Sequence, residues 1–268
     1  MKVDVKDLEN KVVKSVDLPS QFDEQIRFDI IKRAVLSIQA NNRQPYGADP
    51  AAGMKHSAKL SRRRRNYKTS YGFGISRVPR KILSRNGTRM NWVGAQAPGT
   101  VGGREAHPPK ATKLWEQKIN TKERKKAIRS ALAASVSNHY VTQRGHKLPQ
   151  GYPFIVVDAL EALTKTSEVL AGLQQLGFEA ELARCAVKRI RAGKGKSRGR
   201  KYKRTVGPLL VVSGTCALSK SARNIAGVQV CPVSTLSTEL LAPGCAPGRL
   251  VVFSEKALQV MQDKKLFM

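Results

Sequence analysis

Three apolar runs in the second half of the chain decide its fold: PFIVVDAL at residues 153–160, PLLVVSG at 208–214 and RLVVF at 249–253. None of them alternates apolar with polar side chains, so each is typical of a strand buried on both faces of a sheet. Segments with helical spacing lie between the runs, and strands that alternate with helices predict a mostly parallel sheet. We predict an α/β fold: a single globular domain with a mostly parallel central sheet flanked by helices, interrupted by a long extended basic loop.

Local patterns predict the other elements of this domain. Ser20, followed by Asp23 and Glu24, resembles a helix N-cap with acids in the first turn, and the helix is expected to end near Asn41. The remaining expected elements are edge strands or a hairpin within residues 1–20, a helix from Asn120 or Thr121 to 136, a helix over 169–176 closed by Gly177, a strand-like piece at 185–190, a short helix at 219–226, a strand at 228–233, a helical turn at 236–241 and a final helix at 255–262 opened by Ser254.

The stretch from residue 41 to 113 does not resemble a packed domain. It contains sixteen Lys or Arg against two acids, Asp49 and Glu105, and shows no sustained apolar period. Loops of this length inside a compact protein are normally functional or disordered. The aromatic residues among its cations are Tyr46, Tyr67, Tyr71, Phe73 and Trp92. Such a basic segment with planar side chains is suited to becoming ordered against a polyanion.

A second basic stretch, RIRAGKGKSRGRKYKR, covers residues 189–204. Eleven Lys or Arg and no acid lie between residues 184 and 204. Glycines that alternate with cations make a flexible arm whose backbone can lie close to phosphates. The alternative is a solvated charge run or a nuclear address.

The totals favour nucleic acid as the partner. The chain has 268 residues and a formal net charge of +30, which would make an isolated compact domain repel itself. An anionic membrane surface is the lesser alternative, because the cations spread over separate loops and not along an amphipathic helix. We expect no membrane partner, since no run approaches the roughly 20 apolar residues of a spanning helix. The N-terminus lacks a secretory apolar region, so a cytoplasmic location is expected.

The sequence contains none of the common catalytic motifs. Neither a dinucleotide-binding glycine pattern after a strand, nor a phosphate-binding P-loop, nor a nucleophile elbow occurs. The four histidines lack metal-ligand spacing, and the four cysteines lie far apart, as expected for small buried side chains. Asp158 follows a strand but has no carboxylate partner nearby in the sequence, so we expect a capping or loop role. We predict no catalytic residue, no cofactor and no metal.

Seven short motifs occur in order along the chain: NRQPYGADPAAG (42–53), SRVPR (76–80), REAHPPK (104–110), RSALAAS (129–135), RAGKGKSRGRKYKR (191–204), ARNIAG (222–227) and LAPGCAPGRLVVFSEKAL (241–258). Together they resemble the universal large-subunit ribosomal protein L-four family in its archaeal and eukaryotic form. The chain stops soon after its final helix and lacks a long basic C-terminal extension, so it resembles the archaeal members most.

The resemblance implies a structural constituent of the large ribosomal subunit and no enzyme. Residues 1–41 and 111–268 would form the globular domain, residues 42–110 an extended loop that penetrates rRNA, and residues 191–204 a basic arm that also contacts rRNA. The loop would reach the wall of the nascent-peptide exit tunnel, near a neighbouring protein of the L-twenty-two family. Large-subunit rRNA, neighbouring ribosomal proteins and the nascent peptide would be the partners.

Two sets of site residues follow from the resemblance. The residues expected to bind rRNA are Arg43, Tyr46, His56, Arg62, Arg63, Arg64, Arg65, Tyr67, Arg77, Arg80, Arg104, His107, Lys110, Arg191, Lys194, Lys196, Arg198, Arg200, Lys201, Lys203 and Arg204. The residues expected at the tunnel-facing loop tip are Arg85, Asn86, Gly87, Thr88 and Arg89. Two other hypotheses stay open at this point: an RNA-modifying enzyme whose basic loop grips its substrate, and a non-ribosomal RNA or chromatin chaperone.

Overall fold

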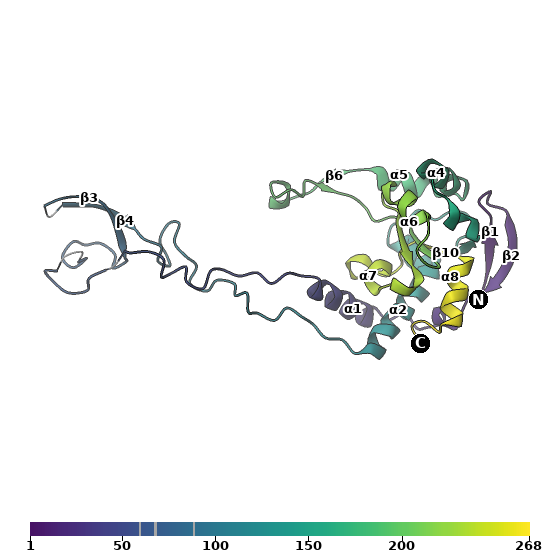
Figure 1. Ribbon diagram of the computed structural model, residues 1–268, viewed down its shortest axis with the longest axis horizontal. Coiled ribbons are helices and arrows are strands. Elements are labelled where there is room, and N and C mark those ends of the chain that lie inside the picture. Colours follow the sequence, from purple (N-terminus) through teal and green to yellow (C-terminus); the bar gives the residue numbers. More distant parts are fainter. Residues whose placement is uncertain (59, 67–68, 88) are drawn as a thin grey trace. The chain divides into compact units, whose positions relative to one another are not determined.

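The computed structural model describes residues 1–58, 60–66, 69–87 and 89–268. The chain divides into two compact units, one made of residues 1–41 and 117–268 and the other of residues 42–116. The first unit is the α/β body, shown with its labelled strands and helices in Figure 1. The described residues of the second unit include a two-stranded hairpin.

A six-stranded sheet forms the centre of the first unit. Its strands are β1 (Lys2–Lys6), β2 (Val12–Asp17), β5 (Phe154–Val156), β8 (Leu209–Val212), β9 (Gln229–Pro232) and β10 (Val251–Ser254), in the spatial order β2-β1-β5-β10-β8-β9. All neighbours pair in parallel except β1 and β2, which form an antiparallel edge hairpin. The predicted fold class is confirmed, including the edge hairpin within residues 1–20.

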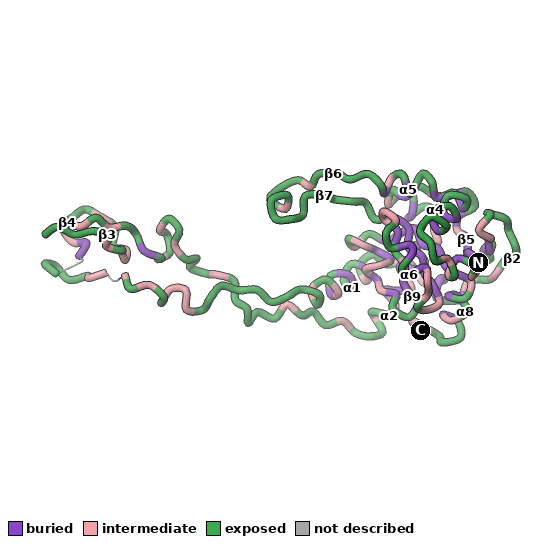
Figure 2. The backbone as a smooth tube through the Cα atoms, turned by 45° about the horizontal axis from the view of Figure 1, so that its top comes forward, coloured by how far each residue is buried: buried purple, intermediate pink, exposed green. Residues whose placement is uncertain are grey.

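The helices cover both faces of this sheet. They are α1 (Phe28–Asn41), α2 (Thr121–Val136), α3 (Asn138–Gln143), α4 (Thr166–Gln175), α5 (Glu179–Ala186), α6 (Leu218–Ser221), α7 (Thr238–Leu241) and α8 (Glu255–Asp263). Side chains of α1, α2, α7 and α8 pack with one face of the strands, and side chains of α4, α5 and α6 pack with the other. The buried segments of Figure 2 accordingly gather at the centre of this unit.

The three apolar runs supply the centre of both packing layers. In β8, Leu209 and Val211 belong to one cluster, whereas Leu210 and Val212 belong to the other. Successive side chains of a strand point to opposite faces of the sheet. When helices cover both faces, every side chain of the strand is buried, so the strand contains no polar residues. Each fully buried Leu or Val contributes roughly 1.5–3 kcal/mol by leaving water.

Several predicted helix ends are confirmed by hydrogen bonds. Ser254 Oγ accepts from the backbone N–H of Ala257 at 3.1 Å and caps α8. Asp158 Oδ1 accepts from the N–H of Lys256 at 2.8 Å, so this carboxylate also satisfies the first turn of α8. Gly177 follows α4 with φ of +86°, a conformation that glycine adopts without steric cost.

Two sequence-based predictions are wrong. The strand-like piece at 185–190 begins inside α5, and only Arg189–Ile190 form a strand, β6. Glu179 and Glu181 in the first turn and Arg184 in the last complement the dipole of α5, which favours the helix. Ser20 is the first residue of a single 3-10 turn, Ser20–Phe22, and not a helix N-cap. Pro19 holds the N-cap position of this turn and has no side-chain acceptor.

Helix α1 begins at Phe28 and not near Ser20. The backbone N–H of Arg27 donates to Ser130 Oγ of α2 at 2.7 Å, and the N–H of Ile31 donates to the Arg27 carbonyl at 3.2 Å. A side chain of another helix therefore supplies the acceptor at this N-terminus, which no local sequence pattern indicates. Among the residues described, no helix is both long and apolar enough to cross a membrane.

Candidate nucleic-acid interface

The two ends of the second unit lie side by side. The backbone N–H of Ala48 donates to the Pro109 carbonyl at 2.8 Å. The rings of Tyr46 and Trp115 are stacked, with centroids 5.6 Å apart and planes 21° from parallel. The guanidinium carbon of Arg43 lies 3.9 Å from the Trp115 ring centroid, within the range of a cation–π contact. Backbone and aromatic contacts thus join residues 43–48 to residues 109–115.

Trp115 is a residue that the sequence-based site prediction missed. Lys113 Nζ lies 4.4 Å from its ring centroid, so Trp115 contacts cations from both ends of the segment. Trp115 was missed because it lies outside the family motifs. Its proximity in the sequence to Lys110 and Lys113 was a pattern that could have indicated a binding role. An aromatic ring in this setting offers a stacking surface beside fixed positive charge.

Strands β3 (Arg80–Asn86) and β4 (Arg89–Gly94) form an antiparallel hairpin within the second unit. No strand was predicted here. The pair Asn86-Gly87 at the end of β3 is typical of hairpin turns, and it was the signal that could have found them. Arg85 Nε donates to the Gly87 carbonyl at 2.9 Å and closes the turn. Of the predicted loop tip, Arg85, Asn86, Gly87 and Arg89 therefore lie together, and Thr88 lies outside the described residues.

Arginines lie against aromatic rings around the hairpin. The guanidinium carbon of Arg77 is 4.5 Å from the Tyr71 ring centroid, and that of Arg80 is 5.2 Å from the Trp92 centroid. Arg80 also donates to the Val78 carbonyl at 3.3 Å and to Ser76 Oγ at 3.1 Å. These contacts hold Arg77 and Arg80 without neutralising their charge.

Acids are scarce throughout this unit. Residues 42–116 contain sixteen Lys or Arg against Asp49, Glu105 and Glu116, a formal excess of thirteen positive charges. Lys55 pairs with Asp49, and its hydrogen bond lowers the pKa of that exposed carboxyl. Arg62 to Arg65 are exposed, and Arg104 donates to the neighbouring Glu105 carbonyl at 3.3 Å. Exposed cations without nearby acids are suited to phosphate contacts.

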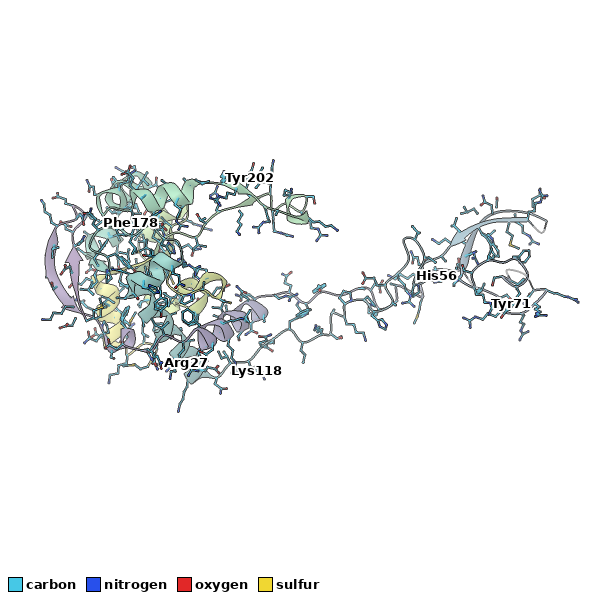
Figure 3. The ribbon with its side chains drawn as sticks, turned by 180° about the vertical axis from the view of Figure 1, so that it is seen from behind. Arg27, His56, Tyr71, Lys118, Phe178 and Tyr202 are labelled. Carbon is cyan, nitrogen blue, oxygen red and sulfur yellow. The ribbon has the colours of Figure 1, made fainter. Side chains whose placement is uncertain are left out.

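Other predicted contact residues occupy different surroundings. His56, labelled in Figure 3, is half-buried and lines a hollow of about 430 Å³ with Asp49, Lys55 and Lys81. Its Nδ1 is buried without a hydrogen-bond partner in the part of the chain that the structure covers. His107 and Lys110 lie near the C-terminal end of the segment, and both are exposed. Tyr67 falls outside the described residues.

The second basic stretch is a narrow projection from the α/β unit. Strand β6 pairs with β7 (Tyr202–Lys203), and the N–H of Arg191 donates to the Lys201 carbonyl at 2.8 Å. Gly193 and Gly199 have φ of +79° and +76°, which lets the chain reverse. Arg191 is half-buried, whereas the exposed cations of the arm are Lys194, Lys196, Arg198, Arg200, Lys201, Lys203 and Arg204. Figure 3 shows the side chains spread around Tyr202 in this arm.

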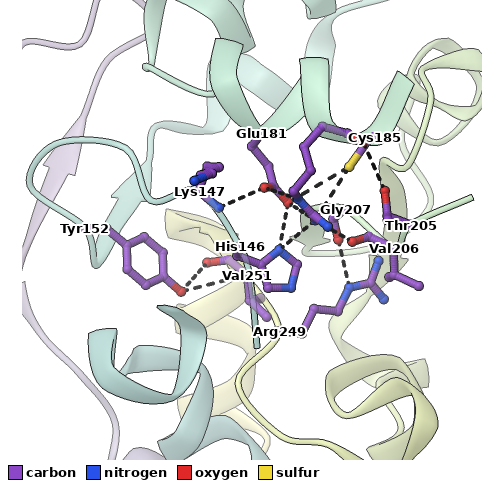
Figure 4. Close-up of polar contacts among 11 residues, drawn as sticks. His146, Lys147, Tyr152, Glu181, Cys185, Thr205, Val206, Gly207, Arg249 and Val251 are labelled. Atoms are coloured by element: carbon purple, nitrogen blue, oxygen red, sulfur yellow. Dashed lines mark hydrogen bonds and ion pairs between the residues drawn. The ribbon is translucent and has the colours of Figure 1, made fainter. Parts of the chain in front are cut away.

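A buried polar cluster holds the base of the arm, as Figure 4 shows. Arg184 donates to both carboxylate oxygens of Glu181, at 2.6 and 2.8 Å, and to the Val206 carbonyl at 2.8 Å. Thr205 Oγ1 donates to the Arg184 carbonyl at 3.2 Å. Arg184 precedes the arm and residues 205–206 follow it, so these bonds fix both of its ends.

His146 completes this cluster. Its Nδ1 lies 2.7 Å from Glu181 Oε1, and both side chains are buried. Burial lowers the pKa of His146, so the ring is neutral near pH 7 and donates its Nδ1 proton to the carboxylate. For Glu181 burial acts to raise the pKa, but hydrogen bonds from Arg184, His146 and the Lys147 N–H outweigh it and lower the pKa to about 2. Arg184 therefore faces a carboxylate that is ionised near pH 7.

Among their described residues, the two basic segments offer cations and stacking rings for binding. No group of three or more His, Cys, Asp or Glu that could hold a metal ion occurs among the residues that the structure covers. The four cysteines are free, with Cys185 and Cys231 buried. Burial raises the pKa of both buried thiols, which makes them poor nucleophiles.

Comparisons with known proteins identify relatives along the whole chain. The model of the ribosomal protein L4/L1 family matches residues 16–264. The large ribosomal subunit protein uL4 of Nanoarchaeum equitans is 51% identical over 268 residues, with all of both chains covered. The uL4 proteins of Archaeoglobus fulgidus and Methanopyrus kandleri are 40% and 42% identical, each over 98% of this chain and 99% of the relative.

Proposed function

This chain belongs to the ribosomal protein L4/L1 family, and we infer that it is a structural component of the large ribosomal subunit that binds large-subunit rRNA in the cytoplasm. The observation that carries this inference is the similarity to large-subunit proteins over the full chain, at 51% identity for one relative. Within such a particle the protein acts by binding and positioning RNA and is not an enzyme.

The charge distribution supports rRNA as the main partner. The second unit holds a formal excess of thirteen positive charges, and the arm at 191–204 adds exposed cations with no acid. Where rRNA helices converge, Arg62 to Arg65, Arg77, Arg80 and Arg104 would neutralise phosphates and allow the helices to pack closely. Each neutralised phosphate releases counterions, so binding weakens as salt rises.

The two basic segments have different roles in this proposal. Residues 42–110 form the rRNA-penetrating loop, and its two ends are joined by the hydrogen bond from the Ala48 N–H to the Pro109 carbonyl. Residues 191–204 form a shorter arm whose ends are fixed to the α/β domain through Arg184 and Thr205. Fixing the base of an arm lowers the entropy lost when its tip binds.

We also propose that the loop reaches the wall of the nascent-peptide exit tunnel. Arg85, Asn86, Gly87, Thr88 and Arg89 would lie at the lumen, near a protein of the L-twenty-two family and the nascent peptide. The support is the family resemblance of the loop motifs, together with the hairpin turn closed by Arg85 and Gly87.

Sedimentation of a cell lysate tests the main proposal. We expect the chain to co-migrate with large subunits through a sucrose gradient and to remain with them after a high-salt wash. A chain that stays at the top of the gradient, or that travels with DNA, would favour a free RNA or chromatin chaperone and contradict the proposal. Saturable micromolar binding of a dinucleotide or of S-adenosylmethionine would instead favour the RNA-modifying enzyme.

A further inference from the structure

The second unit contains a cavity of about 1,020 Å³ between residues 65–66 and 69–75 on one side and the β3–β4 hairpin on the other. Tyr71, Phe73 and Trp92 line it, and so do Arg65, Arg85 and Arg89. All of its lining residues belong to the described part of the chain, and none of them is acidic. Figure 3 labels Tyr71 in this region.

The three aromatic rings that line the cavity are at least partly accessible to solvent. Phe73 is 65% exposed, and Tyr71 and Trp92 are half-buried. Gly72 and Gly74 have φ of +83° and +66°, left-handed values that glycine adopts most readily, so the turn that displays Phe73 depends on them. The ring of Phe73 is therefore accessible for stacking against a planar group of another molecule.

Cations hold two of the rings in place. Arg77 lies over Tyr71 at 4.5 Å, and Arg80 lies over Trp92 at 5.2 Å. Each ring therefore carries a fixed positive charge close to its surface. A ligand with planar groups and negative charge would complement both the ring and the positive charge beside it. A purely apolar ligand would complement the ring alone.

We propose that this cavity receives an unpaired nucleotide of large-subunit rRNA, with its base against the aromatic rings and its phosphate beside Arg65 and Arg89. The proposal rests on the proposed function and specifies which part of the RNA this loop recognises. Pockets for small molecules and cofactors typically enclose about 300–1,000 Å³, so the cavity has room for a nucleotide and part of its neighbour.

An unpaired nucleotide fits better than a base-paired one. In an RNA duplex the bases are stacked on one another, and proteins contact mainly its phosphates and 2′-hydroxyls. Aromatic side chains recognise bases that are splayed out of the stack, and arginine adds a cation–π contribution. The nascent peptide is the competing occupant. The three arginines that line the cavity, Arg65, Arg85 and Arg89, give a peptide no general advantage, whereas every nucleotide carries a phosphate.

Photo-crosslinking in assembled large subunits tests this proposal. p-Benzoylphenylalanine replaces Phe73 in one sample and Leu83 in another, since Leu83 is 63% exposed in β3 and does not line the cavity. We expect position 73 to crosslink to one rRNA nucleotide that is unpaired, found by reverse-transcription stops. Position 83 should give a different set of stops.

The outcomes separate this proposal from the proposed function. A chain that fails to enter large subunits contradicts the proposed function itself. If the chain enters the subunits, a crosslink from position 73 to a paired nucleotide, to a protein or nascent peptide, or to nothing overturns the nucleotide site alone.

Affinity provides a second readout that does not depend on the photoreactive group. For full-length chain and transcribed large-subunit rRNA, we expect Phe73→Leu to weaken binding about tenfold, within the range known for loss of one base–aromatic stack. The salt dependence should stay unchanged, because no charge is removed. Leu83→Ala should bind as the unmodified chain does. Equal affinity for both variants, or a shallower salt dependence for Phe73→Leu, would overturn the proposal.

Discussion

Arg249 is a fully buried cation whose three bonds join separate parts of the α/β unit. Its guanidinium donates to the Gly207 carbonyl at 3.0 Å, and to Gln229 Oε1 and the Leu240 carbonyl, both at 2.8 Å. Burial, aided by repulsion from Arg144, lowers its pKa to about 10. The side chain thus remains charged near pH 7 and stays bound to neutral acceptors around the sheet edge.

We expect Arg249→Ala to destabilise the chain strongly. The change leaves the carbonyls of buried Gly207 and half-buried Leu240 without this donor and creates a cavity, and each unsatisfied buried group costs about 1–3 kcal/mol. The free energy of unfolding should fall by about 3 kcal/mol or more in urea titrations. Arg223→Ala is the control, because Arg223 is exposed. Equal midpoints for the two variants would show that the buried bonds contribute little.

Glu181 makes the stability of the fold depend on pH in the acidic range. Its pKa is about 2 in the folded chain and about 4.5 when exposed, so folding favours the ionised form. A group with a lowered folded pKa stabilises the fold above its unfolded pKa, and this contribution is lost as pH falls from about 4.5 toward 2. His146, whose pKa is also lowered, shifts stability in the same direction by favouring its neutral form.

The acid response can be measured in melts between pH 7 and 3. We expect the melting temperature of the unmodified chain to fall below about pH 4.5, where Glu181 begins to bind a proton on unfolding. Glu181→Gln should melt at a lower temperature at pH 7 and depend less on pH. A variant with the same pH profile as the unmodified chain would exclude Glu181 as the source.

At the scale of elements, apolar runs were the most reliable guide to structure. FIVV, LLVV and LVVF predicted strands because doubly covered strands tolerate no polar position. The end of helix α5 was missed because Cys185 and Ala186 belong to the helix but also begin the stretch 185–190 that resembles a strand. The start of α1 depends on Ser130 from a distant helix, and such tertiary capping leaves no mark in local sequence.

The sequence predicted where the basic segments lie, but it did not predict which of their residues contact one another. Charge density located both basic segments, and the family resemblance supplied their expected partner. The β3–β4 hairpin, the Trp115 stack and the cavity beside Phe73 depend on which residues meet across the segment. A sequence without an apolar period gives no register from which to derive such pairings.

The four consecutive arginines should determine part of the salt dependence of rRNA binding. We expect replacement of Arg62 to Arg65 by Ala to weaken binding and to flatten the slope of log K against log salt by about 3, since up to four phosphate contacts are lost. The measurement is filter binding to large-subunit rRNA at several salt concentrations. A control that replaces exposed Lys2, Lys11, Lys220 and Lys264 by Ala removes the same charge elsewhere. Equal slopes for both variants would show that these arginines contact no phosphate.

At the scale of the whole molecule, the α/β body carries its own core. Both hydrophobic clusters consist of residues from 1–41 and 117–268. We therefore expect a chain that lacks residues 55–100 to keep a cooperative thermal transition close to that of the full chain. Circular dichroism melts of the two proteins make the comparison. Loss of cooperativity in the shortened chain would show that the loop contributes to the core.

Hydrogen exchange of residues 42–58 and 95–116, in the free chain and in the assembled large subunit, tests most directly whether this basic segment binds rRNA. Most of these residues are exposed in the isolated chain, and few of their backbone N–H groups are hydrogen-bonded. We predict rapid exchange in the free chain and exchange at least a hundredfold slower in the subunit, because RNA excludes water from the bound backbone. Equally rapid exchange of these peptides in the subunit, or strong protection already in the free chain, would contradict the account.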